Sequence, residues 1–405
     1  MRTETVVLFC MEGHGHLRRL LPVIAGLSAD GLRVCVFTET RYRDEVAQAG
    51  GELMDLYARG SLADADSESI PSPCRYVTFA GLHAEALLAD VAALRPSMVI
   101  HDTFAVIGQI VARRLGLPRV TVCAGHNFTP ASIPPILADY EQLVASDGCR
   151  RAVDSLRARD LLPDATPFSF ATAPSTDLNL YCEPPQFLRE DERAAFGPLA
   201  FLGSLLPRNL ARPPSASQPF GADPAIRRRI YVCLGTVMWR RYETVGRRLL
   251  ETVRAAVADL PDTVAIISLG NATLGSWVQA LAHPRVHVAD YVDQWDVLSH
   301  ADVFLTHQGL NSTHEAICQE VPMISYPIFW DQPALARRCR ELGLVTPLAA
   351  ARRAPVSVED IRAALATVAE ERERLRDRLR EARAWELDVV AERPNVIARV
   401  LALLD

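Results

Sequence analysis

Short apolar runs alternate with helix-like stretches along most of the chain, and this alternation restricts the fold more than any other feature. In the first half the apolar runs are Val6–Cys10, Arg33–Phe37, Met98–His101 and Arg119–Cys123. The helix-like stretches are Leu17–Ala29, Arg41–Ala49 and Val106–Leu115. Strands that alternate with helices form right-handed βαβ units. The sequence therefore predicts an α/β fold with a parallel sheet covered by helices on both faces.

The alternation resumes after a segment rich in proline and serine, residues 207–224, which we interpret as a linker. The strands expected after it are Ile230–Leu234, Val264–Leu269, Val286–Ala289, Val303–Thr306 and Met323–Tyr326. The helices expected there are Glu243–Leu260 and Ala334–Leu342. A chain of 405 residues is long enough for two domains.

We therefore expect two doubly wound, Rossmann-like domains that face each other across a cleft, at residues 1–206 and 225–380. Residues 381–405 are expected to form a helical segment that packs on the first domain. The charged run Glu370–Arg383 is interpreted as an exposed helix face with ion pairs four residues apart.

Composition restricts the location and the partners. The net charge of −6 gives no support for a nucleic-acid partner, which usually requires a basic face. Nine cysteines, an odd number without a CxxC pair, indicate buried free thiols in a reducing compartment. The residues before Val6 are too few for a signal peptide, and no apolar stretch is expected to span a membrane. We expect a cytoplasmic protein, as a monomer or homodimer.

The most informative segment is Thr306–Glu315, which follows a predicted strand and leads into a helical run. A strand, a glycine-containing turn and a helix N-terminus form an anion site, because free N–H groups and the positive end of the helix dipole point at the ligand. Residues 311–313 (Asn-Ser-Thr) can cap the helix and bind phosphate oxygens, which His307 can also reach. Glu315 can accept two hydrogen bonds from a vicinal diol such as that of a ribose.

A second motif follows the first predicted strand, where residues 11–16 read Met-Glu-Gly-His-Gly-His. Open α/β sheets bind their ligands at the carboxyl ends of strands. A histidine, with an unperturbed pKa of about 6.5, suits a general base for an acceptor hydroxyl there. Asp102 ends another strand at the same edge and can orient the imidazole and stabilise its protonated form.

These segments resemble the UDP-glycosyltransferase superfamily, and most closely its bacterial macrolide-type group, which has the GT-B fold. The family's His-Gly-Gly…Asn-Ser…Glu signature, continued by Asp-Gln, resembles residues 307–315 with 331–332. Its Trp-Val-Pro-Gln stretch resembles residues 291–294, and its Ser-Leu-Gly-Ser/Thr turn resembles residues 233–236. The resemblance spans the whole chain.

The resemblance implies a role for each matching residue. Tyr291 would stack on the uracil, with Val292 and Gln294 at its border. Glu315 would bind the ribose, and Asp331 and Gln332 the hydroxyls of the transferred sugar. The diphosphate would be held by Thr236, His307, Asn311 and Ser312, and Gly235 and Gly309 belong to the same donor-binding stretches.

On the acceptor side, the family's Gly-His-x-Asn-Pro pattern assigns the general base to His16 rather than His14, with Asp102 as its partner. Arg18-Arg19 replaces the Asn-Pro of that pattern. On the donor side, Gln308 stands where the family often has glycine, Tyr291 replaces tryptophan, and Leu335 stands where asparagine is common.

The reaction implied is a direct, inverting displacement that moves a hexose from a UDP-sugar, less so a dTDP-sugar, to a hydroxyl of a small hydrophobic natural product such as a macrolide, polyketide or phenolic aglycone. No resident cofactor is expected, because the nucleotide sugar is a co-substrate. Asp64-Ala65-Asp66 resembles a metal-binding Asp-x-Asp, but no strand precedes it and no His/Cys cluster has zinc spacing, so no metal is expected.

Two other functions stay open. One is an epimerase-like GT-B enzyme that acts on the nucleotide sugar alone, which a donor-only turnover assay would reveal. The other is an inactive, transferase-like binding or helper protein, which would be expected to lack His16 or Asp102. Attack by nitrogen or carbon instead of oxygen is also open. The acceptor cannot be named, because residues 55–90 and 125–180, which would line its pocket, are the least patterned part of the chain.

Overall fold

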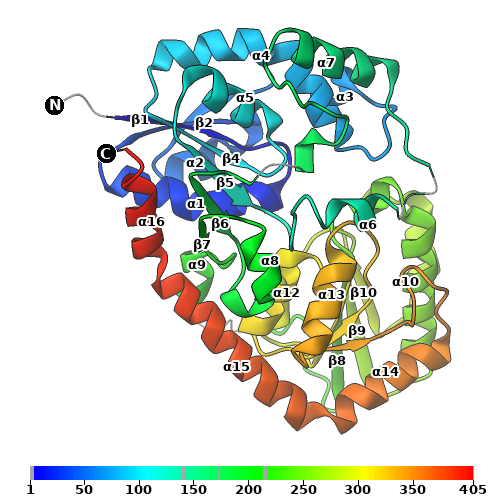
Figure 1. The fold of residues 1–405 in the computed structure, drawn as a ribbon. Coiled ribbons are helices and arrows are strands. Elements are labelled where there is room, and N and C mark those ends of the chain that lie inside the picture. Colours follow the sequence, from blue (N-terminus) through cyan, green and yellow to red (C-terminus); the bar gives the residue numbers. More distant parts are fainter. Residues whose placement is uncertain (1–3, 139, 141, 172–173, 213–216, 405) are drawn as a thin grey trace. The chain divides into compact units, whose positions relative to one another are not determined.

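The computed structural model describes residues 4–138, 140, 142–171, 174–212 and 217–404 (Figure 1). Contacts within the chain divide it into two compact units. Unit 1 comprises the residues up to Leu206 together with those from Val389 onward, and unit 2 comprises Pro207–Asp388. Each unit is built around one parallel sheet, as the α/β prediction requires.

Unit 1 contains a seven-stranded sheet in the order β3-β2-β1-β4-β5-β6-β7, and every neighbouring pair is parallel. Its strands are β1 (Thr5–Phe9), β2 (Arg33–Thr38), β3 (Glu52–Asp55), β4 (Met98–Asp102), β5 (Arg119–Cys123), β6 (Leu178–Tyr181) and β7 (Leu199–Phe201). The strand order reverses between β1 and β4. Loops that leave adjacent strands in opposite directions open a crevice at this point, where α/β proteins bind ligands.

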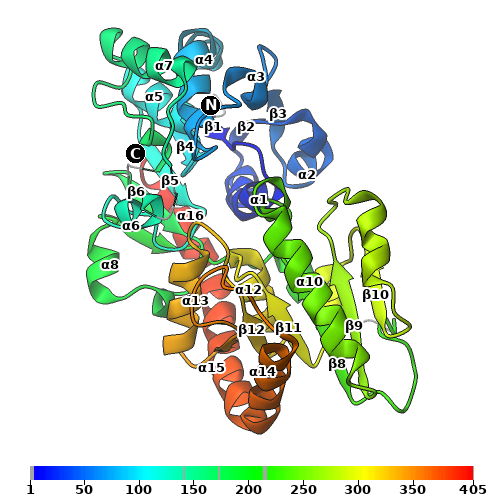
Figure 2. The same ribbon diagram turned by 90° about the vertical axis from the view of Figure 1, so that its right-hand side faces the viewer.

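Helices cover both faces of this sheet (Figures 1 and 2). On one face α1 (His14–Ala29) and α16 (Arg393–Leu401) share a core with the strands, and Gly26 of α1 allows Ile397 to approach closely. On the other face α4 (Cys74–Leu94) packs against α5 (Val106–Leu115) and α7 (Asp147–Ala158). The shorter helices are α2 (Arg43–Gln48), α3 (Leu62–Ala65), α6 (Ile133–Leu137) and α8 (Glu190–Ala194).

One helix of unit 1, α4, is long and apolar enough to cross a membrane by length and composition alone, which was not expected of any stretch of the sequence. Many of its side chains, including Val77, Phe79 and Leu87, are instead buried within unit 1. A core helix that is apolar on several sides passes the same test, so this helix is weak evidence for a membrane span.

Unit 2 contains a six-stranded parallel sheet in the order β10-β9-β8-β11-β12-β13. Its strands are β8 (Arg228–Cys233), β9 (Thr263–Ser268), β10 (Val286–Ala289), β11 (Val303–Thr306), β12 (Met323–Ser325) and β13 (Val345–Pro347). Its order reverses between β8 and β11, so this sheet also has one switch point at its carboxyl edge.

The helices of unit 2 are α9 (Pro207–Leu210), α10 (Glu243–Ala258), α11 (Gln294–Leu298), α12 (Leu310–Cys318), α13 (Gln332–Glu341), α14 (Val358–Glu370) and α15 (Arg372–Ala391), of which α15 continues into unit 1. The core between the sheet and α10 and α14 is formed by aliphatic side chains such as Leu250, Ile267 and Leu365. Of the segment expected to be a linker, residues 207–210 form α9, and residues 213–216 lie outside the described residues.

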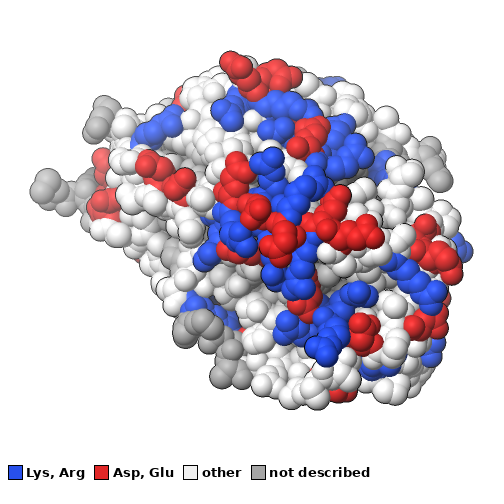
Figure 3. Space-filling view, turned by 90° about the horizontal axis from the view of Figure 1, so that it is seen from below, with Lys and Arg blue, Asp and Glu red and all other residues white. Residues whose placement is uncertain are grey.

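The charged run at residues 370–383 is helical but differs from the prediction in two respects. Helix α14 ends at Glu370 and α15 begins at Arg372, so the run is not one helix. Its intrahelical ion pairs, such as Arg378–Glu381 and Arg380–Asp377, are three residues apart rather than four. Arginine and acidic side chains are interleaved on the molecular face seen in Figure 3.

Candidate active site and donor-binding site

His16 and Asp102 meet at the switch point of the unit 1 sheet. His16 lies in the first turn of α1, directly after β1, and Asp102 is the last residue of β4. The imidazole Nδ1 of His16 is 3.5 Å from Oδ1 of Asp102, and the His16 side chain is 22% exposed whereas that of Asp102 is fully buried. Hydrogen bonds in catalytic sites are often long in the absence of substrate and shorten in the complex. The geometry directs Nδ1 to the carboxylate and leaves Nε2 for a substrate.

Asp102 is held in its ionised form. Burial alone would raise the pKa of Asp102, but the interaction with His16 and two backbone N–H groups outweigh it, so that the pKa is lowered. The N–H of Met11 donates to Oδ2 at 2.8 Å, and the N–H of Phe104 donates to Oδ1 at 2.7 Å. A buried carboxylate fixed by backbone donors can orient an imidazole and stabilise its protonated form.

His14, the other histidine of this loop, has a different environment. Its Nε2 lies 3.1 Å from Glu45 of α2, and its ring stacks on Tyr42. The structure therefore brings His16, and not His14, to Asp102.

An aromatic cluster, which sequence reasoning missed, lies beside His16. The ring of Phe104 is centred 5.1 Å from that of His16 and packs against Tyr76, Phe128 and Phe170. These four residues come from distant parts of the chain, so no local pattern predicts their meeting. The cluster provides His16 with an apolar wall on one side.

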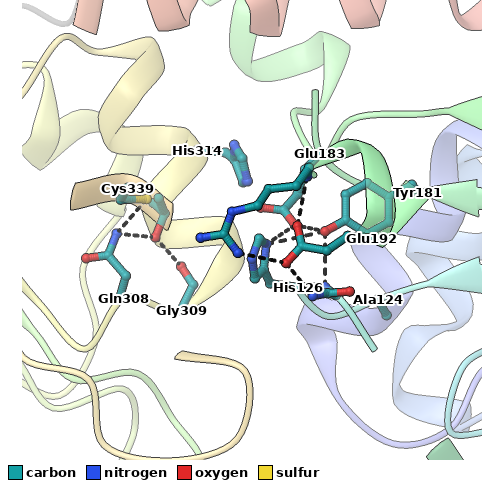
Figure 4. Close-up of polar contacts among 12 residues, drawn as sticks. Ala124, His126, Tyr181, Glu183, Glu192, Gln308, Gly309, His314 and Cys339 are labelled. Atoms are coloured by element: carbon teal, nitrogen blue, oxygen red, sulfur yellow. Dashed lines mark hydrogen bonds and ion pairs between the residues drawn. The ribbon is translucent and has the colours of Figure 1, made fainter. Parts of the chain in front are cut away.

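A second buried network, also missed, stands at the ends of β5 and β6 in unit 1. His126 Nδ1 lies 2.8 Å from Oε2 of Glu183, to which the Tyr181 hydroxyl donates at 2.6 Å (Figure 4). Burial and the charge of Glu183 raise the pKa of Tyr181, so its hydroxyl stays protonated and acts as a donor. This network fixes the loop that leads to Phe128.

In unit 2, His307 stands between two glycines at the switch point. Its Nδ1 lies 3.3 Å from the carbonyl oxygen of Cys233, at the end of the adjacent strand β8. A Cβ atom on Gly235 would lie 2.5 Å from His307 Nε2, and one on Gly309 would lie 2.3 Å from it. Gly235 also has a φ of 76°, a left-handed conformation that glycine adopts readily. Glycine is therefore required on both sides of the imidazole.

Burial lowers the pKa of His307 to about 4, although the bond with the Cys233 carbonyl opposes this shift. The imidazole is therefore neutral near pH 7. A carbonyl oxygen can only accept, so Nδ1 carries the proton and Nε2 carries a lone pair. Nε2 can then donate to a phosphate oxygen only after it gains a proton.

Helix α12 begins at Leu310 with Gly309 as its N-cap. The expectation that residues 311–313 cap the helix is wrong, because they lie inside its first turns. The hydroxyl of Thr313 donates back to the Gly309 carbonyl at 3.0 Å and accepts from the amide of Gln308 at 2.9 Å. Since the N-cap has no side chain, the amino end of α12 retains the character of an anion site.

Gln308 adopts a φ of 61°, which is costly for a residue with a side chain, and it is fully buried. Its amide lies 3.6 Å from the Cys339 sulfur in addition to its bond with Thr313 (Figure 4). The long side chain at a position where the family often has glycine is thus accommodated behind the turn.

Gln294 connects the expected base-binding stretch to the expected ribose ligand. Its Nε2 donates to Oε2 of Glu315 at 2.7 Å and to Oγ of Ser312 at 3.2 Å. Glu315 is only 3% exposed. The structure therefore assembles these three predicted residues into one network. Tyr291 is 60% exposed, so its ring is accessible for stacking, and Val292 beside it is half-buried.

The other predicted donor residues differ in what they contact. Gln332 is the first residue of α13, and its Oε1 accepts from the N–H groups of Ile328 and Phe329, so only its amide nitrogen is left for a sugar. Asp331 is the N-cap of α13. Leu335 is fully buried and therefore belongs to the core rather than to a polar contact with the sugar. Thr236 is exposed and Asn311 is half-buried.

The Asp-x-Asp of the sequence is used locally. Asp64 closes a capping box with Ser61 at the start of α3. Asp66 is buried and accepts from Ser69 and Thr78. Within the described part of the chain, no group of three or more His, Cys, Asp or Glu side chains could hold a metal ion. The nine cysteines are unpaired and buried, as predicted.

The chain is similar to known glycosyltransferases. Residues 229–378 match the family described as UDP-glucoronosyl and UDP-glucosyl transferase. The oleandomycin glycosyltransferase of Streptomyces antibioticus is 27% identical over 86% of this chain and 81% of the relative. An NDP-glycosyltransferase of Bacillus subtilis (strain 168), YjiC, is 23% identical over 85% of this chain and 84% of that protein.

Solved structures match the entire chain. The glycosyltransferase of kitacinnamycin has a TM-score of 0.78 and 22% identity, and all of both chains is covered. CalG4, the calicheamicin glycosyltransferase, has a TM-score of 0.72 and 21% identity over 100% of this chain and 99% of the other. Two α/β units, each built on a parallel sheet, are typical of the GT-B fold.

The fold, the site and these relatives define the class of protein, which is a glycosyltransferase with the GT-B fold. More narrowly, residues 229–378 match the model of the UDP-glucoronosyl and UDP-glucosyl transferase family, and the chain is similar to bacterial antibiotic glycosyltransferases.

The geometry of the His16–Asp102 pair predicts a specific loss on substitution. His16→Ala should lower kcat by about 10²–10⁴-fold, the usual contribution of general-base catalysis, while donor affinity stays near that of the wild type. His14→Ala, which removes the neighbouring histidine paired with Glu45, is the matched control and should retain most activity. Full turnover of an unactivated alcohol by His16→Ala would rule out this assignment.

His307 predicts that binding of the donor diphosphate takes up a proton. The pKa of His307 is about 4 in the free protein, and a phosphate oxygen at Nε2 would raise it. At a pH between the pKa of His307 in the free protein and its pKa in the complex, His307 takes up a proton from solution when UDP binds. The Kd for UDP should therefore rise as pH rises, by up to about tenfold per pH unit.

Calorimetry of UDP binding in two buffers with different ionisation enthalpies measures this uptake. His307→Gln can donate from a neutral amide, so it should bind UDP without taking up a proton. Equal proton uptake in the wild type and His307→Gln would contradict the assignment.

Proposed function

We propose that this enzyme transfers a hexose from a UDP-sugar to a hydroxyl of a small hydrophobic natural product with inversion of configuration. The observation that carries the donor assignment is the buried Glu315 carboxylate on α12, which accepts from Gln294 of α11, and Gln294 also donates to Ser312. The acceptor class follows from similar proteins, among them the oleandomycin glycosyltransferase.

The chemistry proposed is a single displacement. His16 Nε2 takes the proton of the acceptor hydroxyl, and Asp102 stabilises the imidazolium that forms. The acceptor oxygen forms a bond to the anomeric carbon as the bond to the diphosphate oxygen breaks, so UDP leaves with the bonding electron pair. Backbone N–H groups at the start of α12 and protonated His307 would stabilise the charge that develops on UDP.

Two neighbours of the fold support a different donor. The spinosyn rhamnosyltransferase SpnG is described in complex with thymidine diphosphate, and the glycosyltransferase VinC in complex with dTDP. Both are 20% identical or less to this chain, so they share its fold. A dTDP-sugar is therefore the second candidate donor, and the ribose contact distinguishes the two.

Glu315 predicts a preference for UDP-glucose over dTDP-glucose. A carboxylate can accept from both O2′ and O3′ of ribose, whereas deoxyribose offers only O3′. A buried acceptor left without its donor costs about 1–3 kcal/mol, which corresponds to roughly ten- to a hundredfold in kcat/KM. With one acceptor, kcat/KM for UDP-glucose should exceed that for dTDP-glucose by this factor.

Glu315→Ala should remove most of this preference, and Glu320→Ala, just beyond the end of α12, should keep it. Equal use of both donors by the wild type would overturn the UDP assignment. A preference that survives Glu315→Ala would show that another residue recognises the ribose.

We also propose that no metal ion is needed, because the anion site at α12 and His307 supplies the stabilisation of the diphosphate. Activity should persist in EDTA and respond only modestly to added Mg²⁺. The measurement is initial rate after chelation and dialysis. Loss of activity in EDTA with rescue by a divalent cation would contradict the proposal.

A further inference from the structure

A buried pair of ionisable side chains ties the donor-binding helix to α15. His314 lies on α12, directly before Glu315, and its Nδ1 contacts Oε1 of Glu386. Both side chains are completely buried. Neither residue belongs to the donor signature or to the general-base pair, so the proposed chemistry leaves this contact unexplained.

Glu386 lies on the buried face of α15, where the other buried residues are apolar. The buried positions of this helix are Leu375, Leu379, Ala382, Glu386 and Val389, at spacings of four, three, four and three residues, and Glu386 is the polar one among them. Such spacing is typical of a helix that packs along a seam. One polar residue in such a seam lowers stability but fixes the register, because any slip would bury its polar atoms without a partner.

Further contacts of α12 with its neighbouring helices show which part of unit 2 the register of α15 holds in place. Arg383, one turn before Glu386, bonds to Glu320 just beyond the end of α12 at 2.9 Å. On α12 itself, Glu315 is bonded to Gln294. Helix α12 is therefore held by α15 through His314 and by α11 through Glu315, two consecutive residues whose side chains have different partners.

We propose that His314 and Glu386 are a positioning pair for donor binding. By locking α12 to α15 in one register, the pair holds the amino end of α12 where its N–H groups meet the diphosphate. This inference rests on the proposed role of α12 as the diphosphate site. Small displacements of such groups have large effects on binding and rate. An α12 that is free to shift therefore lowers the affinity for the donor and leaves the affinity for the acceptor unchanged.

The test removes both charges together. The double variant His314→Met/Glu386→Leu replaces a buried pair by apolar groups of similar size, which often preserves stability. We expect a melting temperature near that of the wild type, a Kd for UDP and a donor KM raised by about tenfold, and an unchanged acceptor KM. Arg383→Met, which removes the exposed contact of the same helix, is the matched control and should bind UDP as the wild type does.

A folded double variant that binds UDP as tightly as the wild type would overturn the proposal. If the double variant does not fold, Glu386→Gln and Glu386→Asp decide instead. Glutamine keeps the length and can accept from Nδ1, so it should retain UDP affinity, whereas aspartate is too short and should weaken it. Equal affinity in these two variants would also overturn the proposal.

Every variant is titrated with both UDP and dTDP, and the nucleotide that the wild type binds reports on the pair. A wild type that binds only dTDP contradicts the proposed UDP donor but leaves the comparison between variants intact. A wild type that binds neither nucleotide overturns both the proposed donor site and the positioning role.

Discussion

The parallel alignment of strands is the constraint on which both sites depend. In a parallel sheet all carboxyl ends lie at one edge, and the strand order can reverse only where two adjacent strands send their connections to opposite sides. In unit 1 that reversal lies between β1 and β4, which deliver His16 and Asp102. In unit 2 it lies between β8 and β11, which deliver Gly235 and His307. The same topological rule thus places the proposed proton-transfer pair in one unit and the proposed anion site in the other.

The two proposed sites differ in their electrostatics, because one contains a buried charge and the other contains only uncharged groups. Asp102 keeps its charge in a fully buried position because backbone N–H groups and His16 compensate for the loss of water. The anion site proposed in unit 2 consists of uncharged groups, namely a glycine-capped helix end and a neutral imidazole. An anion site without permanent cations can release its product more readily than one that holds a diphosphate by fixed positive charge.

The fold class and several strands could be predicted from the sequence. The alternation predicted the α/β class, and the strands Arg119–Cys123, Val286–Ala289 and Val303–Thr306 were predicted to the residue. These are short apolar runs with clear breaks at both ends. Helix α4 was missed because it buries side chains on several faces and therefore shows little of the one-sided pattern that marks a helix.

The contacts that escaped prediction are those between residues far apart in the chain. Glu183 lies 57 residues from His126, and Glu386 lies 72 residues from His314. No spacing rule connects such positions. The prediction that residues 311–313 cap α12 was based on side chains that are good N-caps by type. It was wrong because α12 begins directly after Gly309, earlier than these residues suggest.

The two histidines of the proposed mechanism must act in opposite protonation states. His16 takes a proton from the acceptor, so it must be neutral when the acceptor binds. His307 must carry a second proton to donate to the diphosphate while Nδ1 remains bonded to the Cys233 carbonyl. A buried imidazole gains that proton readily only when an anionic partner is present, because burial disfavours the charged form. In the proposed mechanism, donor binding therefore charges His307. In the proposed mechanism one residue type serves as base in unit 1 and as anion ligand in unit 2, because burial and the nearest oxygen atoms differ between His16 and His307.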